Sequence, residues 1–273
     1  MKTSFTAGRG VYYFLTGMIA LTFLLPIFWV LYSSVAPNSA TSQADGFGLG
    51  NYEALMGYGE GLGTYLWNSV VVSFVAVGTA LAAGALGGYG FARFNFRGKN
   101  TVFLLVLAIL MVPYAALLIP LAVWMNKIGL QDSLVGVGLV LALFQLPFAT
   151  FMMRNAFEAI PQELEEAALL DGCGQLKAFW RVMLPSVRAP LITVGLFVFL
   201  IAWNDFMVPL FLVGPKNAPL PLAMVNMRQQ TMGVIDYGIT TAGVIVLAIP
   251  AVVLFLSFQK HYIRGFTSGA VKG

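Results

Sequence analysis

Few residues in this sequence could do chemistry on their own. The chain has one cysteine, Cys173, and one histidine, His261, which excludes an internal disulfide, a thiolate metal cluster and a zinc site built from several histidines. No phosphate-binding loop of the G-x-x-x-x-G-K-[ST] type occurs, because the nearest fragment, 98–100, lacks the upstream glycine and the hydroxyl residue. We therefore predict that the chain is not an enzyme and carries no cofactor. If ATP drives it, another chain binds the ATP and the magnesium.

One polar group stands inside a long apolar run. Trp203, Asn204 and Asp205 lie in the segment 191–213, where Asp205 is the only acid. A carboxylate at membrane depth is costly, so it usually faces a cavity or a partner. Aromatic rings can stack on the C–H faces of sugars while amides and acids bind the hydroxyls, so these residues could line a translocation path. The alternative is structural: Asp205 could stabilise a break near Pro209 or bond another helix.

Other residues in the apolar runs suggest packing more than binding. Gln145 and Asn68 are further candidates for the translocation path, with bonding between helices as the alternative role for each. A stripe of small residues recurs every fourth position, at Ala76, Ala80, Gly84 and Gly88. Such a stripe lets two membrane helices approach closely, so we expect a tight helix pair there.

The composition indicates which kind of element must position these residues. Of 273 residues, 59% are hydrophobic and 10% are charged, against about 45–50% and 25% in an average soluble domain. The mean hydropathy is +0.84. These values exclude a disordered chain, a secreted disulfide scaffold and an ordinary cytosolic enzyme. We predict an all-α, polytopic membrane protein.

Six apolar runs are each long enough to cross a bilayer as a helix, which takes about 20 residues. They are 11–32, 68–90, 101–123, 134–153, 191–213 and 240–259. The third contains Pro113 and Pro120, so we expect it to be kinked. The first is too long for a cleaved signal peptide, whose apolar core has about 7–15 residues, and we interpret it as an uncleaved anchor.

The basic residues predict the orientation of the spans. If both termini are cytoplasmic, the N-terminus, the segments 91–100 and 154–190 and the C-terminus place twelve Lys and Arg inside, and only three remain outside. Basic residues resist translocation, so this asymmetry favours cytoplasmic termini. The net charge of +4 is therefore explained by membrane anchoring, and we expect no nucleic-acid partner.

The inner loop 154–190 has helical periodicity. Pro161 followed by acids is typical of a helix start, and Asp171-Gly172 is typical of a helix end. A second short helix is expected over 175–182, ending at Leu184-Pro185. Two amphipathic helices lying on the lipid surface are the alternative, but such helices are usually rich in lysine and arginine rather than acids.

This loop resembles the E-A-A-x-x-x-G…L-P loop of the permeases of bacterial ABC importers. The resemblance is carried by Glu166-Ala167-Ala168, Gly172 and Leu184-Pro185. Three more stretches resemble the carbohydrate-type, maltose-permease-like branch of these permeases: 89–99, Trp203-Asn204-Asp205 and the glycine-rich tail 265–273. The resemblance covers nearly the whole chain and implies the type I permease fold.

The resemblance implies a coupling mechanism. In that family the loop helix seats in a groove on a cytoplasmic ATPase subunit, and closure of the ATPase dimer swings the membrane helices from inward-open to outward-open. The docking residues carried over are Glu166, Ala167, Ala168, Asp171, Gly172, Leu184 and Pro185. The family's tail also contacts the ATPases, which assigns a contact to Gly269 and Lys272.

The implied partners are a homologous second permease, two ATPases that hold ATP and magnesium, an extracytoplasmic binding protein and a sugar or sugar-like solute. The loop 214–239 is expected either to meet the binding protein or to form a packed lid. We expect three parts: 1–67 with the first helix and a long outer loop, the core 68–260 with the coupling loop 154–190, and the tail 261–273.

Two other classes of protein remain as alternatives. A self-sufficient secondary transporter would need carboxylates for coupling ions in its spans, where only Asp205 is available. An intramembrane enzyme would need a histidine pair, a Ser/Lys dyad or two acids within the membrane, and the spans contain none of these.

Overall fold

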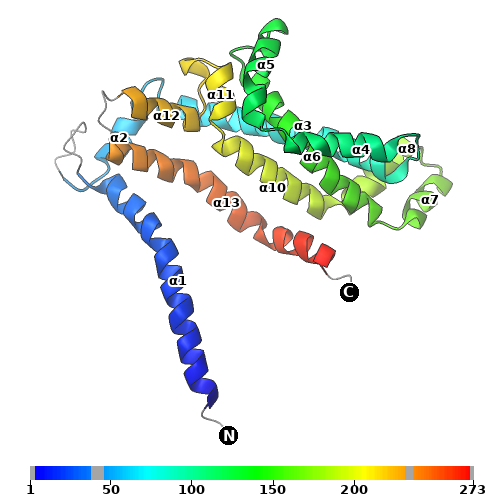
Figure 1. The fold of residues 1–273 in the computed structure, drawn as a ribbon, viewed down its shortest axis with the longest axis horizontal. Coiled ribbons are helices and arrows are strands. Elements are labelled where there is room, and N and C mark those ends of the chain that lie inside the picture. The colour runs from blue at the N-terminus through cyan, green and yellow to red at the C-terminus, as the bar shows by residue number, and fades with distance from the viewer. Residues whose placement is uncertain (1–3, 38–45, 231–235, 271–273) are drawn as a thin grey trace. The chain divides into compact units, whose positions relative to one another are not determined.

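The computed structural model describes the backbone of residues 4–37, 46–230 and 236–270, and no strand occurs among them. Figure 1 shows helices joined by short turns. The helices are α1 (Ser4–Val35), α2 (Gly50–Met56), α3 (Leu62–Arg93), α4 (Lys99–Ala108), η1 (Ile109–Met111), α5 (Tyr114–Lys127), α6 (Leu134–Glu158), α7 (Gln162–Leu170), α8 (Gln175–Ala178), η2 (Phe179–Met183), α9 (Leu184–Ser186), α10 (Arg188–Asn204), α11 (Met207–Leu212), η3 (Pro215–Asn217), α12 (Leu220–Gln230) and α13 (Tyr237–Ala270).

Up to six of these helical segments can cross a membrane. Four single helices are long and apolar enough: 9–35, 62–93, 134–158 and 237–258. Two more candidates are bent pairs, 99–111 with 114–127 and 175–186 with 188–204, whose halves meet at 101° and 77°. The described structure therefore agrees with the predicted number of spans. The helix of the sixth predicted span, α13, continues through most of the expected tail and ends at Ala270.

The predicted kink in the third span is confirmed and lies at Pro113. The helix α4 gives way to the 3-10 turn η1 at Ile109, and Val112 adopts an extended backbone before α5 begins at Tyr114. A proline ring clashes with the carbonyl group four residues earlier and disfavours helix at the preceding residue. Pro113 therefore ends regular helix at 109 and forces Val112 out of it. Pro120, in contrast, lies inside α5.

The predicted fifth span, 191–213, is broken near Pro209, which is the structural alternative that the sequence left open for Asp205. Helix α10 ends at Asn204, Asp205 is extended with ψ 132°, and a separate helix, α11, covers Met207–Leu212. Pro209 disfavours a helical carbonyl at Asp205, four residues before it. The carboxylate of Asp205 accepts from the N–H of Val208 at 2.8 Å, which stabilises the start of α11.

The core of the larger compact unit, Gly63–Ala223 with Pro250–Gly273, is built on α3, α6 and α10. The small-residue stripe of α3 faces α6, and its glycines have no room for a side chain. A Cβ atom at Gly84 would lie 2.7 Å from the Cβ atom of Ala149. The expected tight pair of helices is therefore confirmed. Figure 1 shows α3, α6 and α10 running alongside one another.

The smaller unit contains Met1–Leu62 and Met224–Ile249. A small cluster formed by Leu55, Met227 and Ala242 packs α2, α12 and the start of α13 together. The side chain of Asn51 donates hydrogen bonds to the carbonyl groups of Ser34 and Ala36 at 3.0 Å each, which ties α2 to the end of α1. Within this unit, none of the most apolar window of α1 is buried.

Candidate functional site: a coupling loop and a break in two spans

Helix α7 is the first helix of the coupling loop and begins as the sequence predicts. Pro161 precedes it with an extended backbone, and Glu163 and Glu165 lie in its first turn. Negative charge there compensates the unsatisfied N–H groups and the positive end of the helix dipole. The nine-residue helix ends at Leu170.

A glycine terminates α7. Gly172 has φ +82°, a conformation that other residues adopt only with strain. Its N–H donates to the carbonyl of Leu169 at 3.1 Å, and the N–H of Cys173 donates to the carbonyl of Ala168 at 3.1 Å. These two bonds define a Schellman motif, in which a left-handed glycine satisfies the last carbonyls of a helix. The turn between α7 and α8 therefore has a defined geometry.

The second helix of the loop is longer and less regular than expected. The chain is helical from Gln175 through the π-helix η2 and the short α9, so Leu184 and Pro185 continue the helix rather than end it. The end comes at Val187, where the chain bends by 77° into α10. Pro185 is accepted because it lies in the first turn of α9. Leu184 is half-buried and packs against the core, while Pro185 is exposed.

The structure separates the two alanines of the coupling loop. Glu166, Ala167 and Asp171 are exposed, but Ala168 is buried within the chain, with 8% of its surface accessible. In this conformation Ala168 therefore exposes little surface to a partner and packs against residues of its own chain.

Five large apolar side chains are exposed on the two helices of the loop, and we treat them together as one face. Leu170 is 89% exposed. The other exposed apolar side chains of this face are Leu164, Leu169, Leu176 and Trp180. We call these five residues, with Glu166 and Ala167, the coupling face. An apolar face of this kind marks an interaction site, and the adjacent pair Leu169-Leu170 beside Asp171 was the available sequence signal.

Two residues at the end of α3 contact α7, and neither of them was predicted as a functional residue. The guanidinium Nε of Arg93 lies 3.0 Å from a carboxylate oxygen of Glu165. The hydroxyl of Tyr89 donates to the other oxygen of Glu165. Glu165, the neighbour of the predicted Glu166, is therefore directed into the protein and not toward a partner. The available signal was that Tyr89 and Arg93 belong to the stretch 89–99.

A second candidate site lies where two spans are interrupted. Asp205, between α10 and α11, accepts a hydrogen bond from the N–H of Val208 at 2.8 Å. The hydroxyl of Tyr114, the first residue of α5 after the break at Pro113, lies close enough to interact with the same carboxylate. Irregular backbone at membrane depth is tolerated where it is buried in protein or lines a water-filled cavity. Tyr114 was not predicted for this site.

The structure brings Asp205 together with Tyr114 but separates it from the other predicted path residues. Asn204 is exposed and donates to the carbonyl of Leu200 at 2.7 Å. Trp203 is 2% exposed and stacks on Phe199 with ring centroids 5.4 Å apart. In this conformation its ring faces the core, so of the three residues only Asn204 and Asp205 reach a surface of the described chain.

Asn68 and Gln145 lie in other surroundings. Asn68 is buried in α3 and donates to the carbonyl groups of Lys216 and Ala218 at 3.1 and 3.0 Å. This contact favours the structural alternative for Asn68. Gln145 is half-buried in α6. Of the two tail residues, Gly269 lies near the end of α13, and Lys272 lies outside the described residues.

The loop expected over 214–239 is helical and partly packed. It contains η3 and α12, and residues 218–224 are buried. The N–H of Leu220 donates to the hydroxyl of Ser69 at 2.9 Å, which adds to the contacts from Asn68. This end of the loop is therefore a lid on α3, while residues 231–235 lie outside the described residues.

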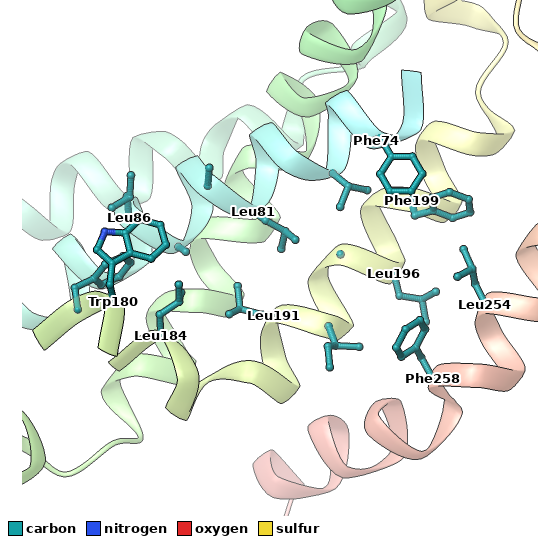
Figure 2. Close-up of a pocket in the computed structure, with 16 residues that line it drawn as sticks. Phe74, Leu81, Leu86, Trp180, Leu184, Leu191, Leu196, Phe199, Leu254 and Phe258 are labelled. Carbon is teal, nitrogen blue, oxygen red and sulfur yellow. The ribbon is translucent and has the colours of Figure 1, made fainter. Parts of the chain in front are cut away.

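A large groove in the same unit is unsuited to a polar solute. It has a volume of about 580 Å³ and lies between α3, η2, α9, α10 and the second half of α13. Figure 2 shows Trp180 and Leu86 at one end and Leu254 and Phe258 at the other. Its lining is apolar almost throughout, so it offers hydroxyl groups no hydrogen bonds. No group of acidic, histidine or cysteine side chains within the described ranges could hold a metal ion.

Comparisons with known proteins identify the family of this chain. Residues 80–267 match the family described as "Binding-protein-dependent transport system inner membrane component". The trehalose transport system permease protein SugB of Mycobacterium tuberculosis (strain CDC 1551 / Oshkosh) is 34% identical over 255 residues, which cover 92% of this chain and 93% of that protein. The arabinooligosaccharides transport system permease protein AraQ of Bacillus subtilis (strain 168) is 30% identical over 266 residues, covering 94% and 93%.

Solved structures show the same fold. A chain of the bacterial alginate ABC transporter, in complex with an alginate pentasaccharide-bound periplasmic protein, superposes with a TM-score of 0.68 at 14% identity. The match covers 97% of this chain and 98% of that one. A chain of the inward-facing MetNI methionine ABC transporter gives a TM-score of 0.55 at 18% identity, covering 78% and 97%. At these identities the likeness concerns the fold.

Proposed function

This chain belongs to the family of binding-protein-dependent transport system inner membrane components, and we propose that it converts movement of a partner ATPase into alternating access of a path for a sugar. It is a permease subunit of an ABC importer, a multi-pass protein of the bacterial plasma membrane and not an enzyme. The proposal concerns how this subunit works, which partners it meets and what it carries.

The coupling face is the observation that carries the proposal. Apolar side chains that surround Glu166 and Ala167 are exposed at one end of the larger unit, on two helices joined by the Gly172 turn. A group of exposed apolar side chains of this kind marks a site of interaction. A groove on a cytoplasmic ATPase is the partner we propose, with Glu166 supplying charge, Ala167 a close fit and Gly172 the turn.

The chain would work within a larger complex. We propose a homologous second permease, two ATPases that bind ATP and magnesium, and an extracytoplasmic binding protein. With the coupling loop in the cytoplasm, both termini are cytoplasmic too, as the charge asymmetry predicts. ATP binding and hydrolysis would shift the population between inward-open and outward-open states.

A sugar or sugar-like solute is the proposed cargo. The support comes from relatives named as trehalose, arabinooligosaccharide and diacetylchitobiose permeases. Within this chain, Asn204, Asp205 and Tyr114 offer an amide, a carboxylate and a hydroxyl beside the two helix breaks. Discontinuous membrane helices commonly surround transport sites, so we place the path beside this break.

Purification of the complex tests the proposal. We expect a tagged chain to bring an ATPase and a second multi-pass chain with it from detergent extracts. Ala167→Arg should leave the chain in the membrane but abolish recovery of the ATPase, because a long charged side chain cannot enter a close-fitting groove. Glu60→Ala, an exposed substitution in the turn that follows α2, is the control and should recover it normally. Sugar uptake by the purified chain alone would instead indicate a secondary transporter.

A further inference from the structure

We propose that Arg93 and Glu165 form a positioning pair that fixes the coupling helix α7 to the end of α3, so that a push on α7 moves α3 as part of the same rigid body. This inference rests on the proposed coupling role of α7. It adds the residues through which the push passes into the membrane helices, which are distinct from those that meet the ATPase.

The pair is nearly buried and makes more than one contact. The side chain of Arg93 is 7% exposed and that of Glu165 is 14% exposed, with 3.0 Å between Nε and the carboxylate. This contact is electrostatic, since Nε makes no hydrogen bond with the described residues. A second guanidinium nitrogen of Arg93 donates to the carbonyl of Ile160 at 2.8 Å. Arg93 therefore contacts both Ile160, which precedes α7, and Glu165 in the first turn of α7. Loss of either charge would leave the other buried without its partner, which is strongly unfavourable.

Tyr89 extends the pair to two more segments. It lies one turn before Arg93 on the same face of α3, and its hydroxyl donates to Glu165. Its ring packs against Phe157 near the end of α6 and against Phe179 in η2, with centroid distances of 5.5 and 4.9 Å. The end of α3 thus contacts α6, α7 and η2 at one point.

The helices behind this point cannot slip past one another. A Cβ atom at Gly88, one residue before Tyr89, would lie 2.6 Å from the Cβ atom of Met153 in α6. Well-packed interiors of this density transmit displacement rather than absorb it. A displacement of α7 is therefore passed to α3 and α6 together.

A second ion pair lies within a single helix. Arg154 and Glu158 pair at 2.8 Å within α6, four residues apart, and Glu158 is 41% exposed. That pair joins no two helices, so it offers a matched control with the same chemistry and without the positioning role.

Spin labels on α3 and α7 test the inference in the purified complex, with no need for the solute. We place them at Thr64, exposed near the outer end of α3, and at Gln162, exposed at the start of α7, by cysteine substitution in a Cys173→Ser background. The distance is measured without nucleotide and after trapping with ATP and vanadate. In the wild-type sequence we expect one distance in both states, because the two helices move together.

The variants then separate positioning from folding. Arg93→Ala should let the distance change by several ångströms on trapping, while Glu158→Gln should behave as the wild type does. The double variant Arg93→Glu with Glu165→Arg restores an opposite-charge pair and should restore the state-independent distance. If Arg93→Ala does not assemble, Glu165→Gln decides, since it keeps the shape and removes the charge.

Each result has one meaning. A state-independent distance in assembled Arg93→Ala, or in Glu165→Gln where that variant decides, would overturn the positioning role and leave the coupling role standing. A distance that changes on trapping in the wild-type sequence would overturn it as well. Absence of ATPases from the purified wild-type complex would contradict the proposed function itself.

Discussion

Gly88 of α3 lies against Met153 of α6 without room for a single additional carbon. A Cβ atom at position 88 would be 2.6 Å from the Cβ atom of Met153 and 2.7 Å from the amide nitrogen of Arg154. The second neighbour is backbone, so a rotamer change of one side chain cannot relieve the clash. We expect Gly88→Ala to destabilise the chain by about 1–3 kcal/mol, as overpacking does.

The measurement is the thermal unfolding of the detergent-solubilised chain. Gly78→Ala is the matched control, because Gly78 lies in the same helix and a Cβ atom there would meet nothing within 4 Å. Alanine is the better helix former, so this control should be neutral or slightly stabilising. Equal effects of the two substitutions would show that α3 and α6 do not pack as described.

The Gly172 turn predicts a second, local effect. With φ +82° at position 172, Gly172→Ala should weaken the end of α7 by about 1–2 kcal/mol, the cost of a left-handed conformation for a residue with a Cβ atom. Gly172→Asn should cost less, since asparagine tolerates that conformation better. Hydrogen exchange of the Cys173 amide reports the change, because that amide donates to Ala168 in the Schellman motif.

A neighbouring glycine serves as the control for this turn. Gly174 has φ −68°, and a Cβ atom there would meet nothing within 4 Å. Gly174→Ala should leave the exchange of the Cys173 amide unchanged. Faster exchange in Gly174→Ala than in Gly172→Ala would contradict the role given to the left-handed glycine.

The number of spans could be predicted from the sequence because it depends on a local property, the length of each apolar run. A break near Pro209 was also one of the alternatives that the sequence left open for Asp205. Proline alone does not predict such a break, because Pro147 and Pro250 lie inside the helices α6 and α13. At Asp205 a second signal is present, since its carboxylate accepts from the N–H of Val208 at the start of α11.

The burial of Ala168 could not be predicted in the same way. Ala167 and Ala168 are the same residue type, and only the direction in which each side of α7 faces distinguishes them. That direction depends on contacts between α7 and α3 such as the pair Arg93 and Glu165, which are far apart in the sequence. Glu165 and Glu166 are likewise indistinguishable until α3 is placed beside α7. Long-range pairs of this kind leave no periodic signal along the chain.

Asp205 permits a test that separates its structural role from contact with the solute. Asp205→Asn keeps an oxygen that can accept from the N–H of Val208, so we expect an unchanged melting temperature. Asp205→Ala removes the acceptor and should cost about 1 kcal/mol, as loss of a helix-capping side chain does. If Asp205 also contacts the solute, Asp205→Asn should raise the KM of uptake with stability unaltered.

The uptake assay uses the sugar that most stabilises the partner binding protein in a thermal-shift panel. Tyr114→Phe removes the hydroxyl that interacts with Asp205 and keeps the ring. It should affect uptake in the same direction as Asp205→Asn if both groups line the path. An unchanged KM in both variants, with a lower melting temperature in Asp205→Ala, would establish a purely structural role for Asp205.

Asn68 holds the lid segment on α3, and its removal should release that segment. The side-chain amide of Asn68 donates to the carbonyls of Lys216 and Ala218 at 3.1 and 3.0 Å. Asn68→Asp would place a carboxylate against two carbonyl oxygens in a buried position, where an unsatisfied polar group costs about 1–3 kcal/mol. We expect the segment to open more often and trypsin to cleave faster after Lys216, which is exposed.

Cleavage by trypsin tracks the population of the open state when opening and closing are fast. The cleavage rate should therefore rise about tenfold for each ~1.4 kcal/mol by which the free energy of opening falls. Ser69→Ala removes the acceptor of the Leu220 N–H and should act in the same direction. Asn126→Asp, an exposed substitution of the same type in α5, is the control. Because Asn68 contacts two carbonyls of the lid and Ser69 one N–H, Asn68→Asp should accelerate cleavage more than Ser69→Ala. Cleavage at the wild-type rate in both variants would mean that the lid is held by its apolar contacts alone.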